Sequence, residues 1–255
     1  MIEENELKER LETSTHAEDL KFRLITVELL RTAKKRYTYR QLAEKTNLPI
    51  TVLSRYAKGH VLPNSERARQ LWTTLSKIVG LETELRRRIK FNREGYFDNT
   101  SIVGDINILR QAANYALARF AGRRVTKVLT AAVDGVPLAT MISSSLGVNL
   151  VVAKCNKEVG VSSFFEETYV LDGSGVTMTL YMPRDAIKRR DSVLVVDDTI
   201  KSGDTQAALV NLVYKAKAEI SGVFSMIALG DAWHRKLKLP EDCPVEILLR
   251  LEIPR

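Results

Sequence analysis

The sequence has few of the residues that mark secreted, metal-binding or membrane-spanning proteins. Only two cysteines occur in its 255 residues, Cys155 and Cys243, and neither belongs to a CxxC pair or a Cys/His array. This argues against a disulfide framework and a zinc finger. The first residues lack the basic and apolar blocks of a secretory signal, and no run approaches the roughly 18 apolar residues of a membrane span. We expect a soluble, cytoplasmic protein with no membrane partner.

Acidic residues are scarce in one stretch of the chain, which concentrates its positive charge. Residues 31–93 hold 16 Lys and Arg against 4 Asp and Glu, whereas residues 94–255 hold 19 of each. Such a basic segment fits a polyanionic partner, either nucleic acid or an anionic membrane surface. The membrane is disfavoured because the basic residues flank polar helix faces rather than bulky apolar ones. Length and charge together predict two domains, residues 1–93 and 94–255.

The first domain is predicted to be all-α. Apolar residues recur every three or four positions over residues 20–33, which predicts one amphipathic helix. Two short helices follow within residues 38–59, with Thr38 as the cap of the first and Pro49 in the first turn of the second. Ser65 is expected to cap a further helix. The layout resembles the helix-turn-helix of the phage-repressor class, whose second helix enters the major groove of double-stranded DNA.

The resemblance implies a recognition helix over residues 49–58. The residues it brings to DNA are Arg40, Gln41, Thr51, Ser54, Arg55 and Lys58. Arg55 is the best candidate for reading a base, because a guanidinium pairs bidentately with guanine. Each residue could instead lie on a solvated helix face. The basic segment at residues 86–90 either tracks a phosphate backbone or is a solvated basic helix.

The most informative motif is Val193-Leu-Val-Val-Asp-Asp-Thr-Ile-Lys-Ser-Gly-Asp-Thr205. Its apolar run predicts a buried parallel strand, and the helical spacing of residues 207–216 places residues 199–205 at a helix N-terminus. Such a terminus attracts anions. Asp197 and Asp198 are predicted at the carboxyl end of the strand, where two carboxylates can accept hydrogen bonds from neighbouring ribose hydroxyls.

These thirteen residues resemble the phosphoribosyl diphosphate (PRPP) signature of type I phosphoribosyltransferases. The resemblance implies that the acids hold the ribose and that the loop wraps the 5-phosphate. The residues concerned are Asp197, Asp198, Thr199, Ile200, Lys201, Ser202, Gly203, Asp204 and Thr205. The alternative is a strand and helix that serve only as core. Asp204 is unusual in a phosphate loop, and we expect its carboxylate to cap the helix.

The rest of the second domain is predicted to be α/β with a mostly parallel sheet. Expected strands cover residues 125–133, 148–153, 176–182, 220–228 and 245–251, and a long excursion over residues 158–174 resembles the mobile lid of the same family. A turn after the first strand resembles its diphosphate loop. The residues implied for diphosphate binding are Ala132, Val133, Asp134, Gly135, Lys154 and Lys157. Both lysines could also be solvated strand-end residues.

The parts together resemble archaeal regulators that fuse a helix-turn-helix to a type I phosphoribosyltransferase-like domain, related to the purine-operon repressor and to xanthine and orotate phosphoribosyltransferases. One function this implies is a transcription regulator, a homodimer on DNA, with PRPP or a nucleotide as effector. The other is an active purine or orotate phosphoribosyltransferase. Residues 131–134 offer no Arg or Lys to a leaving diphosphate, which favours the regulator. Mg²⁺ is expected with PRPP, not held by protein ligands alone, and no residue is assigned as catalytic.

Overall fold

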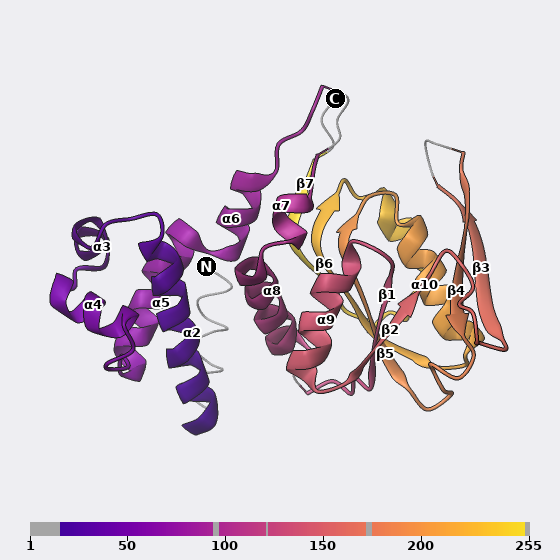
Figure 1. Ribbon diagram of the computed structural model, residues 1–255, viewed down its shortest axis with the longest axis horizontal. Coiled ribbons are helices and arrows are strands. Elements are labelled where there is room, and N and C mark those ends of the chain that lie inside the picture. The colour runs from indigo at the N-terminus through magenta and orange to yellow at the C-terminus, as the bar shows by residue number, and fades with distance from the viewer. Residues whose placement is uncertain (1–15, 94–96, 121, 172–174, 253–255) are drawn as a thin grey trace. The chain divides into compact units, whose positions relative to one another are not determined.

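The computed structural model describes residues 16–93, 97–120, 122–171 and 175–252 (Figure 1). The chain divides into two compact units, residues 1–84 and 85–255, which are described separately below. The division falls within α6 (Leu81–Arg88), nine residues before residue 93. No helix in the described part of the chain is long and apolar enough to cross a membrane.

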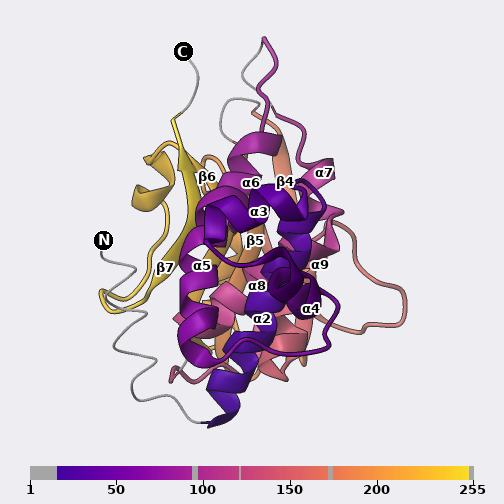
Figure 2. The same ribbon diagram turned by 90° about the vertical axis from the view of Figure 1, so that its left-hand side faces the viewer.

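The first unit is built from helices around one leucine-rich core (Figure 2). Its elements are α2 (His16–Lys34), α3 (Tyr39–Thr46), α4 (Ile50–Ala57), α5 (Ser65–Val79) and the first half of α6. Leu30, Leu42 and Leu53 are fully buried and bring α2, α3 and α4 onto the same core as α5. The predicted apolar face of α2 is only partly buried, because Leu20 and Leu24 are 38% and 48% exposed.

Side-chain caps set where these helices begin. Thr38 and Gln41 form a capping box at α3, as the sequence allowed for Thr38. The expectation for Ser65 is wrong. Asn64 caps α5 instead, because its backbone is extended and its side-chain oxygen accepts a hydrogen bond from the Arg67 amide at 2.9 Å. In α4, Pro49 is the residue before the helix rather than part of its first turn.

The second unit is an α/β layer structure around a five-stranded parallel sheet with the order β2-β1-β5-β6-β7. Its strands are β1 (Lys127–Ala131), β2 (Asn149–Ala153), β5 (Ser192–Ile200), β6 (Glu219–Leu229) and β7 (Val245–Leu251). All five were expected within a few residues. The central strand β5 is buried on both faces, in keeping with its continuous apolar run.

Helices cover both faces of this sheet (Figure 1). β1 leads through α9 (Gly135–Leu146) to β2, and β5 leads through α10 (Asp204–Lys215) to β6 on the other side. Because these right-handed crossovers run in opposite directions across the sheet, α9 and α10 lie on opposite faces. α8 (Ile106–Arg119) packs beside α9. Short helices, α7 (Thr100–Val103) and η1 (Ala232–Arg235), complete the unit.

A separate antiparallel hairpin occupies much of the expected lid. β3 (Phe164–Val170) pairs with β4 (Thr177–Pro183) along its whole length, so describing residues 158–174 as one excursion without a strand is wrong. β3 docks on α10, where the Glu167 carboxylate contacts both Asn211 and Lys215. This ordered pairing explains the aromatic and β-branched residues of the segment. Residues 172–174 lie outside the described part of the chain.

Candidate functional site

Two loops meet where the order of the sheet reverses. The loop after β1 and the loop after β5 leave adjacent parallel strands at their carboxyl ends, and their helices depart to opposite faces. A crevice at such a point is the usual ligand site of an open α/β sheet. The start of α9 lies close to β5 at Gly135, since a Cβ atom there would lie 2.7 Å from Asp197 Oδ1. Only glycine fits this position.

Asp197 lies inside the strand rather than at its end. β5 continues through Ile200, which corrects the predicted position of both acids. The carboxylate accepts hydrogen bonds from Gln206 Nε2 at 2.5 Å and from the Asp198 amide at 3.0 Å. Burial, followed by the neighbouring charge of Asp198, raises the pKa of Asp197 well above its ordinary value of 3.8. The site therefore holds a carboxyl group that is costly to ionise.

Asp198 points to a different set of partners. Its Oδ2 atom accepts hydrogen bonds from Asn99 Nδ2 at 2.6 Å and from the Thr199 hydroxyl at 2.8 Å. Its backbone carbonyl accepts one from Ser225 of β6 at 3.0 Å. Asn99 precedes α7, so a segment far away in sequence contributes directly to this site. Both acids are thus buried and each accepts a hydrogen bond from a side-chain amide, Asp197 from Gln206 and Asp198 from Asn99.

Residues 199–205 run from the end of β5 through a tight turn at residues 201–203 into the first turn of α10, and the turn packs against η1. Ile200 is fully buried, and Lys201 is exposed with its ammonium 5.9 Å from the Phe97 ring centre. Gly203 has φ +83° and is the residue before α10, and a Cβ there would lie 2.7 Å from Cβ of Trp233. The Thr205 hydroxyl lies 3.4 Å from the phenol of Tyr169 on β3. The loop therefore opens a helix, as predicted, but with glycine at the cap position.

The expected capping role of Asp204 is wrong. Asp204 is the first residue of α10, and its carboxylate accepts hydrogen bonds from the Ser202 hydroxyl at 2.6 Å and from Lys236 Nζ at 2.7 Å. Its negative charge is compensated by the ion pair with Lys236. The first turn of a helix also stabilises an acidic side chain, because the helix dipole is positive at that end.

The loop after β1 presents backbone and one acid, but no Lys or Arg side chain. Val133 is 77% exposed, Asp134 is exposed, and Gly135 begins α9. The Ala132 amide donates to the Ala153 carbonyl at 2.9 Å, which places the end of β2 beside this loop. Lys154 and Lys157 follow β2, but both ammonium groups contact glutamates, Glu158 at 2.8 Å and Glu166 at 3.5 Å. A ligand would have to compete with these exposed pairs.

The DNA-contact candidates all lie on α3, α4 or directly after them. Arg40, Gln41, Thr51, Arg55 and Lys58 are exposed, and Ser54 is half-buried. Gln41 is partly engaged, because its side-chain oxygen accepts a hydrogen bond from the Thr38 amide at 2.9 Å. The sequence therefore identified an accessible polar face on this helix pair, although Gln41 supports helix α3 as well.

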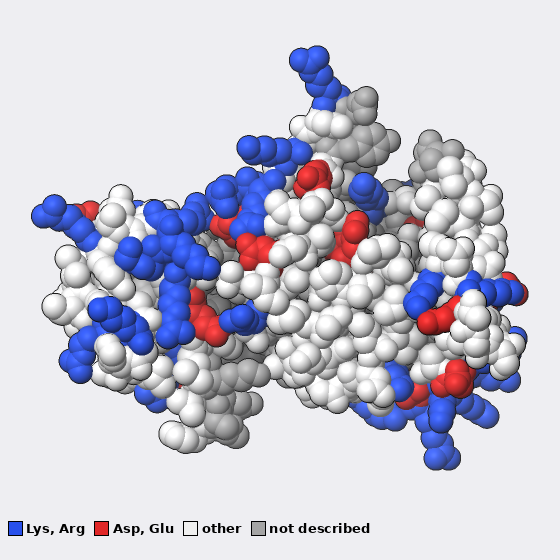
Figure 3. Space-filling view, viewed as in Figure 1, with Lys and Arg blue, Asp and Glu red and all other residues white. Residues whose placement is uncertain are grey.

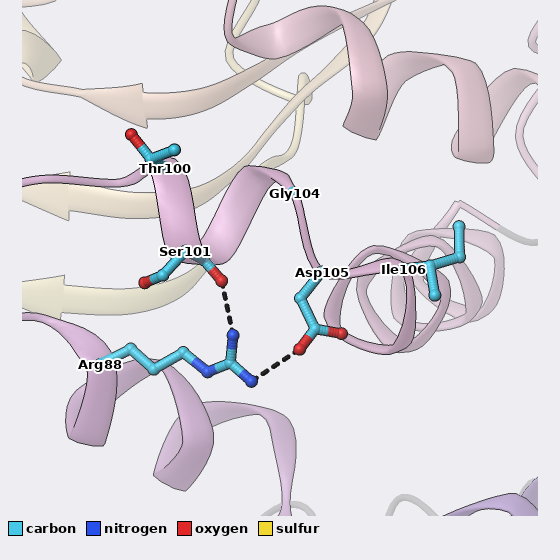
Figure 4. A pocket seen from close by; sticks show the side chains of 6 residues that line it. All are labelled: Arg88, Thr100, Ser101, Gly104, Asp105 and Ile106. Carbon is cyan, nitrogen blue, oxygen red and sulfur yellow. Dashed lines mark hydrogen bonds and ion pairs between the residues drawn. The ribbon is translucent and has the colours of Figure 1, made fainter.

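A shallow depression of about 400 Å³ lies beside α7 in the second unit (Figure 4). Arg88 crosses it, donating hydrogen bonds to the Ser101 carbonyl and to the Asp105 carboxylate at 2.6 Å. Asp105 also accepts from the Asn107 amide at the start of α8. Arg88 thus fixes the corner between α7 and α8, a structural task that neither predicted role for the basic segment included.

Comparison with known proteins gives the family. No family model matches the chain. The xanthine phosphoribosyltransferase of Brevibacillus brevis is 31% identical over 137 residues, which cover 52% of this chain and 68% of that enzyme. The adenine phosphoribosyltransferase of Paracoccus denitrificans is 30% identical over 156 residues, covering 60% and 81%. The chain belongs to the phosphoribosyltransferase family.

The phosphoribosyltransferase relationship extends to a regulator and to the fold. The purine biosynthesis transcriptional repressor PurR of Bacillus subtilis is 30% identical over 129 residues, 51% of this chain and 45% of the repressor. The chain thus spans about half the length of that relative. The adenine phosphoribosyltransferase structure from Rhodothermus marinus superimposes with a TM-score of 0.58 at 29% identity, over 67% of this chain and 98% of that one.

Sequence reasoning missed several residues of this phosphoribosyltransferase-type site. Gln206 carried a usable signal, since a polar residue on the buried face of α10 needs a partner. Asn99 carried none, because only the folded chain brings it to Asp198.

Proposed function

We propose that the chain is a DNA-binding transcription regulator whose phosphoribosyltransferase-like unit binds PRPP or a nucleotide as effector. The observation that carries the proposal is the exposed α3–α4 pair, since a salvage enzyme has no evident use for a basic recognition face. Similarity to a purine repressor supports the same reading. The α3 and α4 helices, joined at the left-handed residue Asn47, would act as a helix-turn-helix.

Charge supports a nucleic-acid partner for the helical unit. Lys and Arg gather over this unit on the face shown at the left of Figure 3, where Asp and Glu are few. In this role Arg40 and Lys58 contact phosphates, Gln41 orients neighbours, and Arg55 reads a base edge. Thr51 and Ser54 lie about one turn apart on α4, the helix that also carries Arg55. A homodimer would present two such helices to half-sites about one DNA turn apart.

In the second unit, the two loops would bind different parts of the PRPP molecule. Asp198 and Asp197 would accept the ribose hydroxyls, while the amides and hydroxyls of residues 199–205 bind the 5-phosphate. Backbone of residues 132–135 faces the diphosphate, with Lys154 and Lys157 at the end of β2. No group of three or more His, Cys, Asp or Glu side chains in the described residues is arranged to hold a metal. Mg²⁺ would then be held chiefly by PRPP oxygens.

An active nucleobase phosphoribosyltransferase is the second candidate. The identity with xanthine and adenine phosphoribosyltransferases favours it, because 137 and 156 residues of this chain align with those enzymes. Against it stands the loop after β1, which supplies no Arg or Lys to a departing diphosphate. Catalysis of this kind relies on stabilising that leaving group.

Calorimetric titration with PRPP and Mg²⁺, followed by each common nucleobase, separates the two functions. The regulator predicts binding with no diphosphate release, and release with one base would make the chain an enzyme and name its substrate. The double variant Asp197→Asn and Asp198→Asn should lose PRPP binding while its circular dichroism stays unchanged. Unaltered affinity in this variant would remove the sugar-site assignment. Selection from random duplexes then finds the operator, and failure to enrich any sequence counts against the regulator.

A further inference from the structure

An acid in the proposed phosphate loop needs a physical explanation. Asp204 is the first residue of α10, directly after Gly203, so its carboxylate shares the helix terminus that would receive a 5-phosphate. Two anions at one helix terminus repel each other unless a cation lies between or beside them. The loop itself contains Lys201, whose ammonium lies toward the Phe97 ring.

Lys236 supplies that cation from η1. Its ammonium lies 2.7 Å from Asp204 Oδ1, and the two side chains are 32% and 12% exposed. Ser202 donates to the other carboxylate oxygen at 2.6 Å, so both oxygens of Asp204 are turned inward to protein donors. A partly buried pair of this kind is screened less by solvent than a surface pair.

The position of Lys236 is fixed by packing on the same loop. Trp233 is fully buried, and its indole N–H donates a hydrogen bond to the Gly230 carbonyl at 2.9 Å. Its backbone and Cβ pack against Gly203. The Lys236 amide in turn donates to the Trp233 carbonyl at 3.1 Å. η1 therefore packs directly against the phosphate loop. This contact places the Lys236 ammonium beside Asp204.

We infer that Lys236 is a positioning residue that neutralises Asp204 and so allows the loop at residues 199–205 to accept a phosphorylated sugar. The inference rests on the proposed PRPP site and adds a determinant of its affinity. Lys236 acts through Asp204 and does not itself bind the phosphate. Its importance therefore depends on the presence of the Asp204 charge.

Five variants, each compared with the unaltered chain, test this by calorimetry with PRPP and Mg²⁺ and, separately, with ribose 5-phosphate. Lys236→Met should weaken both ligands about tenfold or more, because the phosphate then meets an uncompensated carboxylate. Asp204→Asn should bind at least as well as the unaltered chain. The double variant should recover to within about threefold of the unaltered chain, and Lys236→Arg should stay close to it. Lys215→Met serves as the control for net charge. Lys215 lies on α10, the helix that begins with Asp204, but its ammonium pairs with Glu167 of β3.

Each result decides between readings. A double variant as weak as Lys236→Met would mean that Lys236 contacts the phosphate directly, and it overturns the counter-ion role. Equal loss in Lys215→Met would reduce the effect to overall charge. Thermal unfolding of every variant identifies any that has lost its fold, and Lys236→Arg then carries the comparison. If the unaltered chain binds neither ligand, the PRPP site itself fails and the inference fails with it, an outcome distinct from binding without rescue.

Discussion

The adjacent acids of β5 are both buried, but they contact different parts of the chain. Asp197 is enclosed by Gln206 and the loop at Gly135, and its pKa is raised, chiefly by burial. Ionised Asp197 therefore destabilises the folded protein, whereas Asp198 accepts a hydrogen bond from Asn99 that a ligand hydroxyl could replace.

Replacing Asp197 with Asn should stabilise the protein at neutral and alkaline pH. The folded pKa lies above the ordinary value of 3.8, so the folded state binds more protons and the penalty grows as pH rises between the two values. Urea unfolding at pH 8 should show a gain of about 1–3 kcal/mol, the usual cost of a poorly solvated buried polar group. The gain should shrink toward pH 4. Equal stability of both proteins at pH 8 would contradict the assigned burial cost.

Asp191 provides a control of opposite sign. Burial acts to raise its pKa, but hydrogen bonds from the Lys188 amide and the Thr126 hydroxyl outweigh it, and the pKa is lowered. Its stabilising contribution is present above the unfolded pKa and is lost as pH falls through the folded one. Asp191→Asn should therefore cost about 1 kcal/mol at pH 8. A stabilised Asp191→Asn would show that these two acids cannot be told apart in this way.

Asn99→Ala should tighten PRPP binding about threefold to tenfold. The Asn99 amide occupies Asp198 Oδ2 at 2.6 Å, and a ribose hydroxyl must compete with it. A typical hydrogen bond contributes about 1 kcal/mol net, which corresponds to about fivefold in affinity. Calorimetry measures the change, with Asn107→Ala on α8 as the control. Weaker binding would instead make Asn99 a direct contact to the sugar.

At the scale of elements, the αL glycine before α10 links helix geometry to the site. Gly203→Ala should destabilise the second unit by about 2 kcal/mol or more, because a Cβ adds a collision with Trp233 to the strain of positive φ. Gly147 ends α9 at φ +69° with nothing within 4 Å of a Cβ, so Gly147→Ala should cost only about 1 kcal/mol. Thermal unfolding compares them, and equal losses would dismiss the contact with η1.

Elements with a strong local pattern could be predicted, and those decided by partners could not. β5 and α10 follow from an apolar run and a helical spacing, both of which the structure has. β3 was missed because its exposed alternation and acids mask a strand that exists through pairing with β4 and docking on α10. The cap at Asn64 was missed because Ser65 is an equally good cap by type.

The same distinction holds for the site. Its loops belong to contiguous motifs, so residues 132–135 and 197–205 could be named from sequence. Asn99 and Lys236 join them only through contacts between residues far apart in the chain. The role of Asp204 was misjudged for that reason, since a capping acid and an ion-paired acid look identical until the cation is found.

For the whole molecule, DNA recognition is the property to test. Arg55→Ala should weaken binding to a selected operator by about 1–3 kcal/mol and binding to random duplex far less, because Arg55 is exposed on α4 and is proposed to read a base. Fluorescence anisotropy with both duplexes gives the difference. Arg40→Ala is the matched control, and it should weaken both duplexes similarly and lower the salt dependence. Equal effects of Arg55→Ala on both would make it a phosphate contact.

The reversal of strand order between β1 and β5 has a consequence for how the second unit folds. The two loops of the site are neighbours only after Val128 pairs with Leu194, a contact between distant parts of the chain. Pairings of this kind form slowly, because closing a long loop costs conformational entropy before the new contacts can stabilise the chain. The site that these loops form therefore cannot exist in any intermediate that lacks the central pairing. Ligand added during refolding should bind only at the end and should slow unfolding more than it speeds folding.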